Sequence, residues 1–194
     1  MARRLPQFLR PAEAEQLLAQ TRSERERLAI ATMLYLGLRI SETCALRVED
    51  LDLDDLQLLI RRGKGGKDAY VRLPRALVPW IRSYLTSKAL RRGWLFPSPG
   101  QGLTHMHRRW LEYLVPNLAG AAGIQRRITP HHLRHTYAVS LLQAGVPLTE
   151  VSHMMRHSQL ETTTIYLHVV TDHLQVYADR LPIPTGQGRL WAVR

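Results

Sequence analysis

Only one segment of this chain has the sequence pattern of two paired β-strands. Residues 56–62 (Leu-Gln-Leu-Leu-Ile-Arg-Arg) and 69–73 (Ala-Tyr-Val-Arg-Leu) read as strands, and the Gly-Lys-Gly-Gly-Lys-Asp stretch between them is typical of a turn. The other long segments carry helix signals. The sequence therefore predicts an α+β fold that is mainly α-helical, with a small antiparallel β-sheet near residues 56–73.

Prolines, capping residues and glycines mark where the helices begin and end. Pro11 occupies the first position of a helix that runs to about Ala19, and Ser23 caps a second helix that Gly37 ends. Further helices are predicted over residues 41–46, 74–85, 104–122, 129–143, 147–155, 160–168 and 171–181, with a surface loop over 95–103.

The length of the chain bounds its domain organisation. With 194 residues it can form one domain with a real core. We expect one folded domain over residues 1–181 and a tail over 182–194 that does not pack in an isolated monomer.

The charge of the chain indicates its class of partner. A formal net charge of +11 favours a nucleic acid, although charge alone does not separate DNA from RNA, and a basic surface without a partner remains an alternative.

Cys44 is the single cysteine, so neither a disulfide framework nor a cysteine zinc site can form within a monomer. The longest apolar run, Leu28 to Leu38, is too short to cross a bilayer. We therefore expect a cytoplasmic protein with no membrane partner.

Arg39 lies in Gly-Leu-Arg-Ile-Ser-Glu, at a bend after an apolar helix. An arginine is costly to bury unless its guanidinium meets an anion or a carboxylate. An ion pair with Glu42 and a contact with a phosphate are both open, and they are compatible because Glu42 can hold the side chain while other N–H groups face a phosphate.

Lys64 lies at the tip of the Gly-rich hairpin. A lysine there can deliver a proton to a leaving oxygen as a general acid. Taken alone, it is more simply explained as an exposed turn lysine.

His131 and Arg134 are three residues apart on one predicted helix and so share a face, which favours an anion as their target. Zinc is the competing hypothesis, because His131 and His135 are four apart, as are His153 and His157. Neither pair has the glutamate of a His-Glu-x-x-His helix, so we expect no metal.

Tyr166 follows His157 by nine residues and comes directly after a run of threonines, which are weak helix formers. A tyrosine on an amphipathic helix is most often a half-buried aromatic. A tyrosine can also attack a phosphodiester when positive side chains stabilise the charge that develops on the phosphate.

The candidates, in chain order, are Arg39, Lys64, His131, Arg134, His157 and Tyr166. They occur in a Gly-Leu-Arg-x-Ser-Glu bend, a Gly-Lys-Gly-x-Lys hairpin, a Pro-His-x-Leu-Arg-His helix and a Thr-Thr-x-x-Tyr-x-His-Val helix. This set resembles the catalytic signature of the tyrosine recombinases, the phage-integrase family. The resemblance runs from about Leu5 to Tyr177, and six matching positions in matching context are far more specific than any one of them.

The resemblance implies a site-specific DNA recombinase or integrase that needs no metal, cofactor or ATP. Tyr166 would attack the scissile phosphate and leave a 3′-phosphotyrosine, while Arg39 and Arg134 hold the non-bridging oxygens. Lys64 would protonate the departing 5′ oxygen.

The same resemblance assigns the remaining roles. His131 would assist proton transfer, and His157 would donate a hydrogen bond to the phosphate. Glu42 would hold the catalytic side chains in place without contacting the phosphate. The partner would be double-stranded DNA, bound by a tetramer on paired sites, with a monomer free in solution.

Two features depart from the family's pattern. Met155-Arg156 stands where the family usually has Leu-Gly, which adds bulk and charge next to His157. We also expect no N-terminal core-binding domain in this chain, since the resemblance to the catalytic part begins almost at Met1. Two other functions remain as alternatives: relaxation of DNA alone, as by a type IB topoisomerase, and a non-catalytic DNA-binding regulator of recombination sites.

Overall fold

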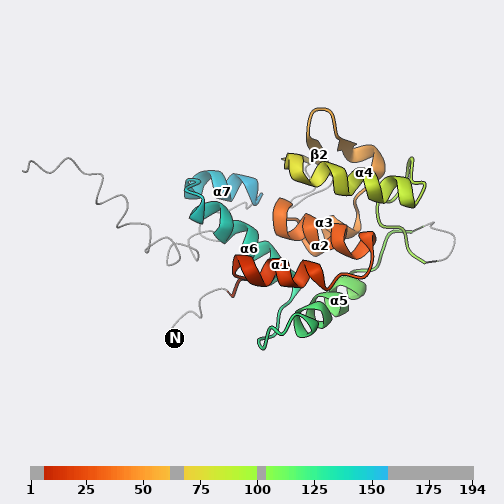
Figure 1. Cartoon of the computed structure of the whole chain (residues 1–194). Helices are drawn as coiled ribbons and strands as arrows, with labels where there is room; N and C mark the ends of the chain where they lie inside the picture. Colours follow the sequence, from red (N-terminus) through yellow and green to blue (C-terminus); the bar gives the residue numbers. More distant parts are fainter. Residues whose placement is uncertain (1–6, 62–67, 100–103, 157–194) are drawn as a thin grey trace, which may run out of the picture.

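The computed structural model describes residues 7–61, 68–99 and 104–156 of the chain (Figure 1). The described helices and strands, in chain order, are α1 (Pro11–Ala19), α2 (Glu24–Leu36), α3 (Ile40–Cys44), the 3-10 turn η1 (Val48–Asp50), β1 (Leu51–Asp52), β2 (Gln57–Ile60), β3 (Ala69–Arg72), the 3-10 turn η3 (Arg75–Leu77), α4 (Val78–Ser87), α5 (Arg108–Ala121), α6 (Pro130–Gln143) and α7 (Leu148–Met154). The helices predicted over 160–168 and 171–181 lie outside these residues.

Helix α2 is the central element. The hydroxyl of Ser23 accepts a hydrogen bond from the backbone N–H of Glu26, as predicted for an N-cap, and Gly37 ends the helix in the left-handed conformation. Helices α1, α3, α4 and α6 all pack against α2. In Figure 1, α2 lies between α4 and the sheet on one side and α1 on the other, while α6 and α7 form one end of the molecule.

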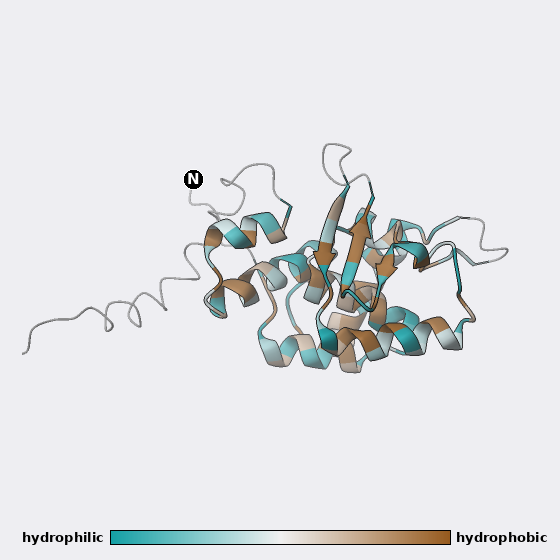
Figure 2. Cartoon of the chain, turned by 90° about the horizontal axis from the view of Figure 1, so that it is seen from above, coloured by the Kyte–Doolittle hydropathy of each residue, from teal (hydrophilic) through white to brown (hydrophobic). Residues whose placement is uncertain are grey.

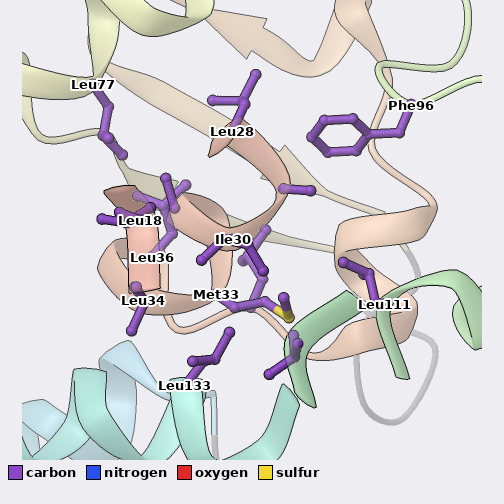
Figure 3. Packing of buried hydrophobic residues seen from close by; sticks show 14 of the residues in the cluster. Leu18, Leu28, Ile30, Met33, Leu34, Leu36, Leu77, Phe96, Leu111 and Leu133 are labelled. Carbon is purple, nitrogen blue, oxygen red and sulfur yellow. The ribbon is translucent and has the colours of Figure 1, made fainter. Parts of the chain in front are cut away.

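One large apolar cluster fills the space around α2. Figure 3 shows Ile30 and Met33 of α2 close to Leu133 of α6 and Leu111 of α5. A second, smaller cluster joins α6 to α7 through Val139, Leu142, Val151 and Met155. The helices carry both apolar and polar residues, as expected for elements with one face in the core and the other in solvent (Figure 2).

The sheet has three antiparallel strands in the order β1-β2-β3. Leu58 of β2 pairs with Val71 of β3, and both side chains are buried. Tyr70, which precedes Val71 on β3, points outward and is 71% exposed. This alternation confirms the predicted strands at residues 57–60 and 69–72. The two-residue strand β1 was not predicted, because so short a segment has no periodicity to detect.

The bend after α2 brings the backbone of Gly37 against the ring of Tyr137 in α6. Gly37 has φ +60°, and a Cβ at this position would lie 2.3 Å from Cδ1 of Tyr137. Only glycine allows both the conformation and the approach. The bend therefore packs closely against α6.

The segment at residues 95–103 was predicted as a surface loop, and its first two residues contradict that prediction. Leu95 and Phe96 are buried, because the backbone N–H of Leu95 donates to the carbonyl of Leu46 and Phe96 accepts from the N–H of Met106. The following helix, predicted from residue 104, begins at Arg108.

Within the part of the chain that the structure describes, no helix combines the length and the apolar character that crossing a bilayer requires.

Candidate active site

The carboxylate of Glu42 is the centre of the site. Arg39 immediately precedes α3, and Glu42 lies in the first turn, so its side chain reaches back to the start of the helix. One carboxylate oxygen accepts from the backbone N–H of Arg39 at 2.7 Å, and the other accepts from its Nη1 at 2.7 Å. This confirms the predicted ion pair between Arg39 and Glu42 and fixes the direction of the arginine side chain.

Arg134 of α6 joins this carboxylate from a distant part of the sequence. Its residue is 5% exposed, its Nη1 donates to the carbonyl of Gly37, and its Nη2 donates to the carbonyl of Met155. The Nη1 atom lies 3.8 Å from Oε2 of Glu42. Arg134 therefore ties the bend after α2 to the end of α7, and its guanidinium is held rigidly.

Arg39 is the more accessible of the two arginines, with a side chain that is 24% exposed. Its Nη2 donates to the carbonyl of Arg156 at 3.2 Å. Both arginines therefore contact backbone carbonyls just after the end of α7, and Arg134 also contacts the bend at Gly37.

The side chain of Arg156 also reaches Glu42, a contact that sequence reasoning did not find. Its Nη2 donates to Oε2 of Glu42 at 2.7 Å. The only sequence signal was an arginine where the family usually has glycine, and this signal does not identify a partner 114 residues away.

The electrostatics of Glu42 follow from these contacts. Burial by itself would raise its pKa, but the charge of Arg156 and the hydrogen bonds from Arg39 outweigh burial, so the pKa of Glu42 lies below its ordinary value. The carboxylate is thus ionised at neutral pH and faces three guanidinium groups.

The histidines of α6 have three different environments. His131 is exposed at the start of the helix, on the same element as buried Arg134. His132 accepts a hydrogen bond from the backbone N–H of Thr129 at 3.1 Å, which caps the helix. Burial lowers the pKa of His135 to about 4, with nearby positive charges adding to the effect, so His135 is neutral at pH 7. His131 is the most accessible to solvent of the three.

A depression of about 630 Å³ lies next to Glu42, lined by Ser41, Glu42, Ala45, Arg47, Arg61 and Trp94. The guanidinium of Arg47 lies over the ring of Trp94, 4.2 Å from its centroid, and Arg61 pairs with Asp50 at 2.7 Å. Both arginines are thus oriented by neighbouring side chains. Another depression, of about 490 Å³, is lined by four carboxylates, Glu49, Asp50, Asp52 and Asp54, and suits an anionic ligand poorly.

The described residues bring Arg39, Glu42 and Arg134 together, with His131 on the same helix as Arg134. The predicted residues Lys64, His157 and Tyr166 lie outside the described residues, so their positions and roles stay predictions.

Comparison with known proteins gives a consistent picture. The model of the phage integrase family matches residues 7–173. A tyrosine recombinase of Pseudothermotoga lettingae is 39% identical over 170 residues, which cover 87% of this chain and 58% of that protein. The tyrosine recombinase XerA of Thermococcus kodakarensis is 36% identical over 177 residues, which cover 89% of this chain and 62% of the relative. The chain thus spans about three-fifths of the length of these curated relatives.

Solved structures show the same similarity. The crystal structure of a XerA recombinase matches with a TM-score of 0.80 and 29% identity, over 94% of this chain and 66% of that one. The XerH site-specific recombinase, in a post-cleavage complex with its difH substrate, matches with a TM-score of 0.77 and 27% identity, over 91% of this chain and 54% of that one.

Proposed function

Because this chain belongs to the phage integrase family, we propose that it is the catalytic part of a site-specific DNA recombinase. The observation that carries the proposal is the joining of Arg39 and Arg134 on one buried, ionised carboxylate. Two oriented guanidinium groups form a ready site for the charge that develops on a phosphate during transesterification. Relatives named tyrosine recombinases support the same reaction class.

In the proposed reaction, the phenolic oxygen of Tyr166 forms a bond to the scissile phosphorus and its proton leaves with the help of His131. The bond from phosphorus to the 5′ oxygen breaks, and Lys64 gives that oxygen a proton. The product is a 3′-phosphotyrosine and a free 5′-hydroxyl. Since the phosphodiester energy is kept in the covalent bond, another 5′-hydroxyl can attack and rejoin the strand without ATP.

The arginines have different parts in this scheme. Arg39 is partly exposed and donates directly to a non-bridging oxygen of the phosphate. Arg134 is fixed by two carbonyls, so its contribution is a preorganised positive charge that does not reorganise when the phosphate binds. His157 adds a hydrogen bond to the phosphate.

We infer double-stranded DNA as the partner and the depression beside Glu42 as the path of the neighbouring backbone. Arg47 and Arg61 line this depression, and the net charge of +11 favours a polyanion. The XerH relative was solved bound to its difH substrate. We also propose that the protein acts in the cytoplasm.

We further propose that the chain is a monomer in solution and a tetramer on paired DNA sites. Sedimentation with and without DNA tests this. A tetramer that forms without DNA, or a single bound protomer per pair of sites at saturation, contradicts it.

Covalent capture tests the proposed reaction. A pool of nicked duplexes with randomised sequence is incubated with the protein, and DNA that stays attached after SDS treatment is recovered. We expect an SDS-resistant adduct whose DNA converges on one sequence, and no adduct from Tyr166→Phe. Equal adduct levels with Tyr166→Phe, or no adduct while both proteins bind DNA, would contradict the proposal.

The recovered sequence then separates recombination from relaxation. On two copies of that site we expect Holliday-junction intermediates. Relaxation of supercoiled plasmid without such intermediates would restrict the activity to nicking and closing.

A further inference from the structure

Arg156 adopts a backbone conformation that disfavours any side chain. It follows the C-terminal end of α7 with φ +53°, in the left-handed region where glycine is usual after a helix. An arginine at this position introduces backbone strain, so contacts of the side chain must offset it.

The side chain of Arg156 turns into the protein. It is 11% exposed, its Nη2 donates to Oε2 of Glu42 at 2.7 Å, and its Nη1 donates to the carbonyl of Met154 at 3.2 Å. A guanidinium is seldom buried unless it is paired, so the ion pair with Glu42 accounts for its position.

Arg156 is one of two close partners of Oε2 of Glu42. This oxygen accepts from Nη2 of Arg156 at 2.7 Å and from the backbone N–H of Arg39 at 2.7 Å, and Nη1 of Arg134 lies 3.8 Å away. The ion pair with Arg156 therefore restrains the same carboxylate that orients Arg39 through its other oxygen.

We propose that Arg156 is a positioning residue of the phosphate site: by its ion pair with Glu42 it fixes the carboxylate that orients Arg39. This inference rests on the proposed function, because the anion that profits is the scissile phosphate. Arg156 acts through Glu42 and is not assigned a contact with DNA.

The proposal has a consequence for pH. The charged groups that face Glu42 are Arg39 before α3, Arg134 of α6 and Arg156 after α7, while Arg47 and Arg61 line the adjacent depression. Arg156 contributes to the lowered pKa of Glu42. Without it the pKa rises, so the ionised carboxylate, and with it the orientation of Arg39, is lost at a higher pH as the solution is acidified.

The test compares Arg156→Gly with the unmodified chain. Glycine adopts φ +53° without strain, and this gain opposes the cost of the lost ion pair, so we expect the variant to fold. On the DNA sequence recovered by covalent capture, we expect adduct formation to be slower by on the order of 10- to 100-fold, the effect of a misplaced catalytic group, and the acid limb of its pH–rate profile to lie at higher pH. An unchanged rate overturns the proposal.

Two further variants make the test specific. Ala89→Gly relieves a similar strain, at φ +50°, without removing a charge, and should leave the adduct rate unchanged. In a Glu42→Gln background, Arg156→Gly should have little additional effect on the rate, since Arg156 acts through the carboxylate. Full additivity of the two substitutions contradicts this route. If Arg156→Gly does not fold, Arg156→Gln, which keeps a polar side chain but removes the charge, decides: a slower rate supports the proposal and an unchanged rate overturns it.

A measurement without DNA separates this proposal from the proposed function. The carboxyl carbon of Glu42 is titrated by NMR in the chain and in Arg156→Gly. A higher pKa in the variant supports the ion pair even if no covalent adduct is ever found. An identical titration overturns the positioning role, whatever the activity of the chain.

Discussion

At the residue scale, Gly37 links the fold to the site. It ends α2, its carbonyl accepts from Arg134, and it touches the ring of Tyr137. Arg39 follows two residues later and precedes α3, where it pairs with Glu42. Gly37, which has no side chain, thus connects Arg134 to the segment that contains Arg39 through its backbone carbonyl.

We expect Gly37→Ala to lower the free energy of unfolding by roughly 2 to 5 kcal/mol, because a left-handed conformation and a close approach to Tyr137 both oppose a Cβ. Urea unfolding measures this change. Gly123→Ala is the matched control, since Gly123 has φ +73° but no atom within 4 Å of the position of a Cβ. A cost for Gly37→Ala no larger than for Gly123→Ala would show that the contact with Tyr137 is unimportant.

Arg134 and His131, three residues apart on α6, should respond differently to substitution. Arg134→Lys leaves two backbone carbonyls without their charged partner, so we expect a loss of roughly 2 to 4 kcal/mol in stability together with loss of DNA cleavage. His131→Ala removes an exposed side chain, and stability should change by less than about 0.5 kcal/mol.

For His131→Ala, cleavage should nevertheless fall by about 10²- to 10⁴-fold, the usual contribution of a general acid or base. Thermal unfolding and adduct formation are measured on both variants. Wild-type cleavage by His131→Ala removes this residue from the proton-transfer scheme.

At the element scale, α1 is fastened by a buried ion pair. Both oxygens of Glu13 accept from the guanidinium of Arg126, at 2.6 and 2.7 Å, and Arg126 also donates to the carbonyl of Phe8. These hydrogen bonds, against the opposing effect of burial, lower the pKa of Glu13 to about 2. Helix α1 is therefore attached to the segment that leads into α6.

This ion pair predicts a pH dependence of stability. The folded-state pKa of Glu13 lies below its ordinary value of 4.5, so its contribution is present above pH 4.5 and is lost as the pH falls towards about 2. We expect Glu13→Gln to lose about 2 kcal/mol at pH 7 and to show a flatter stability profile below pH 4.5.

Urea unfolding between pH 7 and pH 2 measures both effects. Glu15→Gln, at an exposed position of the same helix, is the control and should follow the unmodified chain. A Glu13→Gln profile parallel to that of the unmodified chain below pH 4.5 would contradict the assignment.

At the scale of the whole molecule, positive charge is concentrated beside the site by packing. Arg47 is held over Trp94, and Arg61 is held by Asp50, so both face one depression next to Glu42. The composition gives only the net charge of +11, whereas the structure shows where part of that charge lies, beside Glu42.

We expect DNA binding by this chain to be weak and strongly dependent on salt, because contacts with phosphates dominate it. Arg47→Gln and Arg61→Gln should each reduce the slope of log K against log salt by about 1, the effect of one lost phosphate contact. Arg109→Gln, exposed on α5 and not among the residues that line the depression, is the control. Equal slopes for all four proteins would show that DNA does not cross this depression.

The sequence predicted the local structure well, and the residues show why. Pro11, Ser23 and Pro130 begin helices where the structure begins them, since a helix start depends on neighbours within about four residues. The burial of Leu95 was missed because its backbone partner, Leu46, is distant in the sequence, and the strand at residues 51–52 was missed because two residues show no periodicity.

By itself, the sequence determined the order of most helices and strands and the choice of candidate residues, and it offered the ion pair between Arg39 and Glu42 as one of two open interpretations, because these follow from local contacts. Only the tertiary structure decided that Arg134 and Arg156 meet the same carboxylate, the latter across 114 residues. The physical reason is that a buried charge needs a partner, and packing supplies it: α2 packs against α3 and α6, and α6 packs against α7.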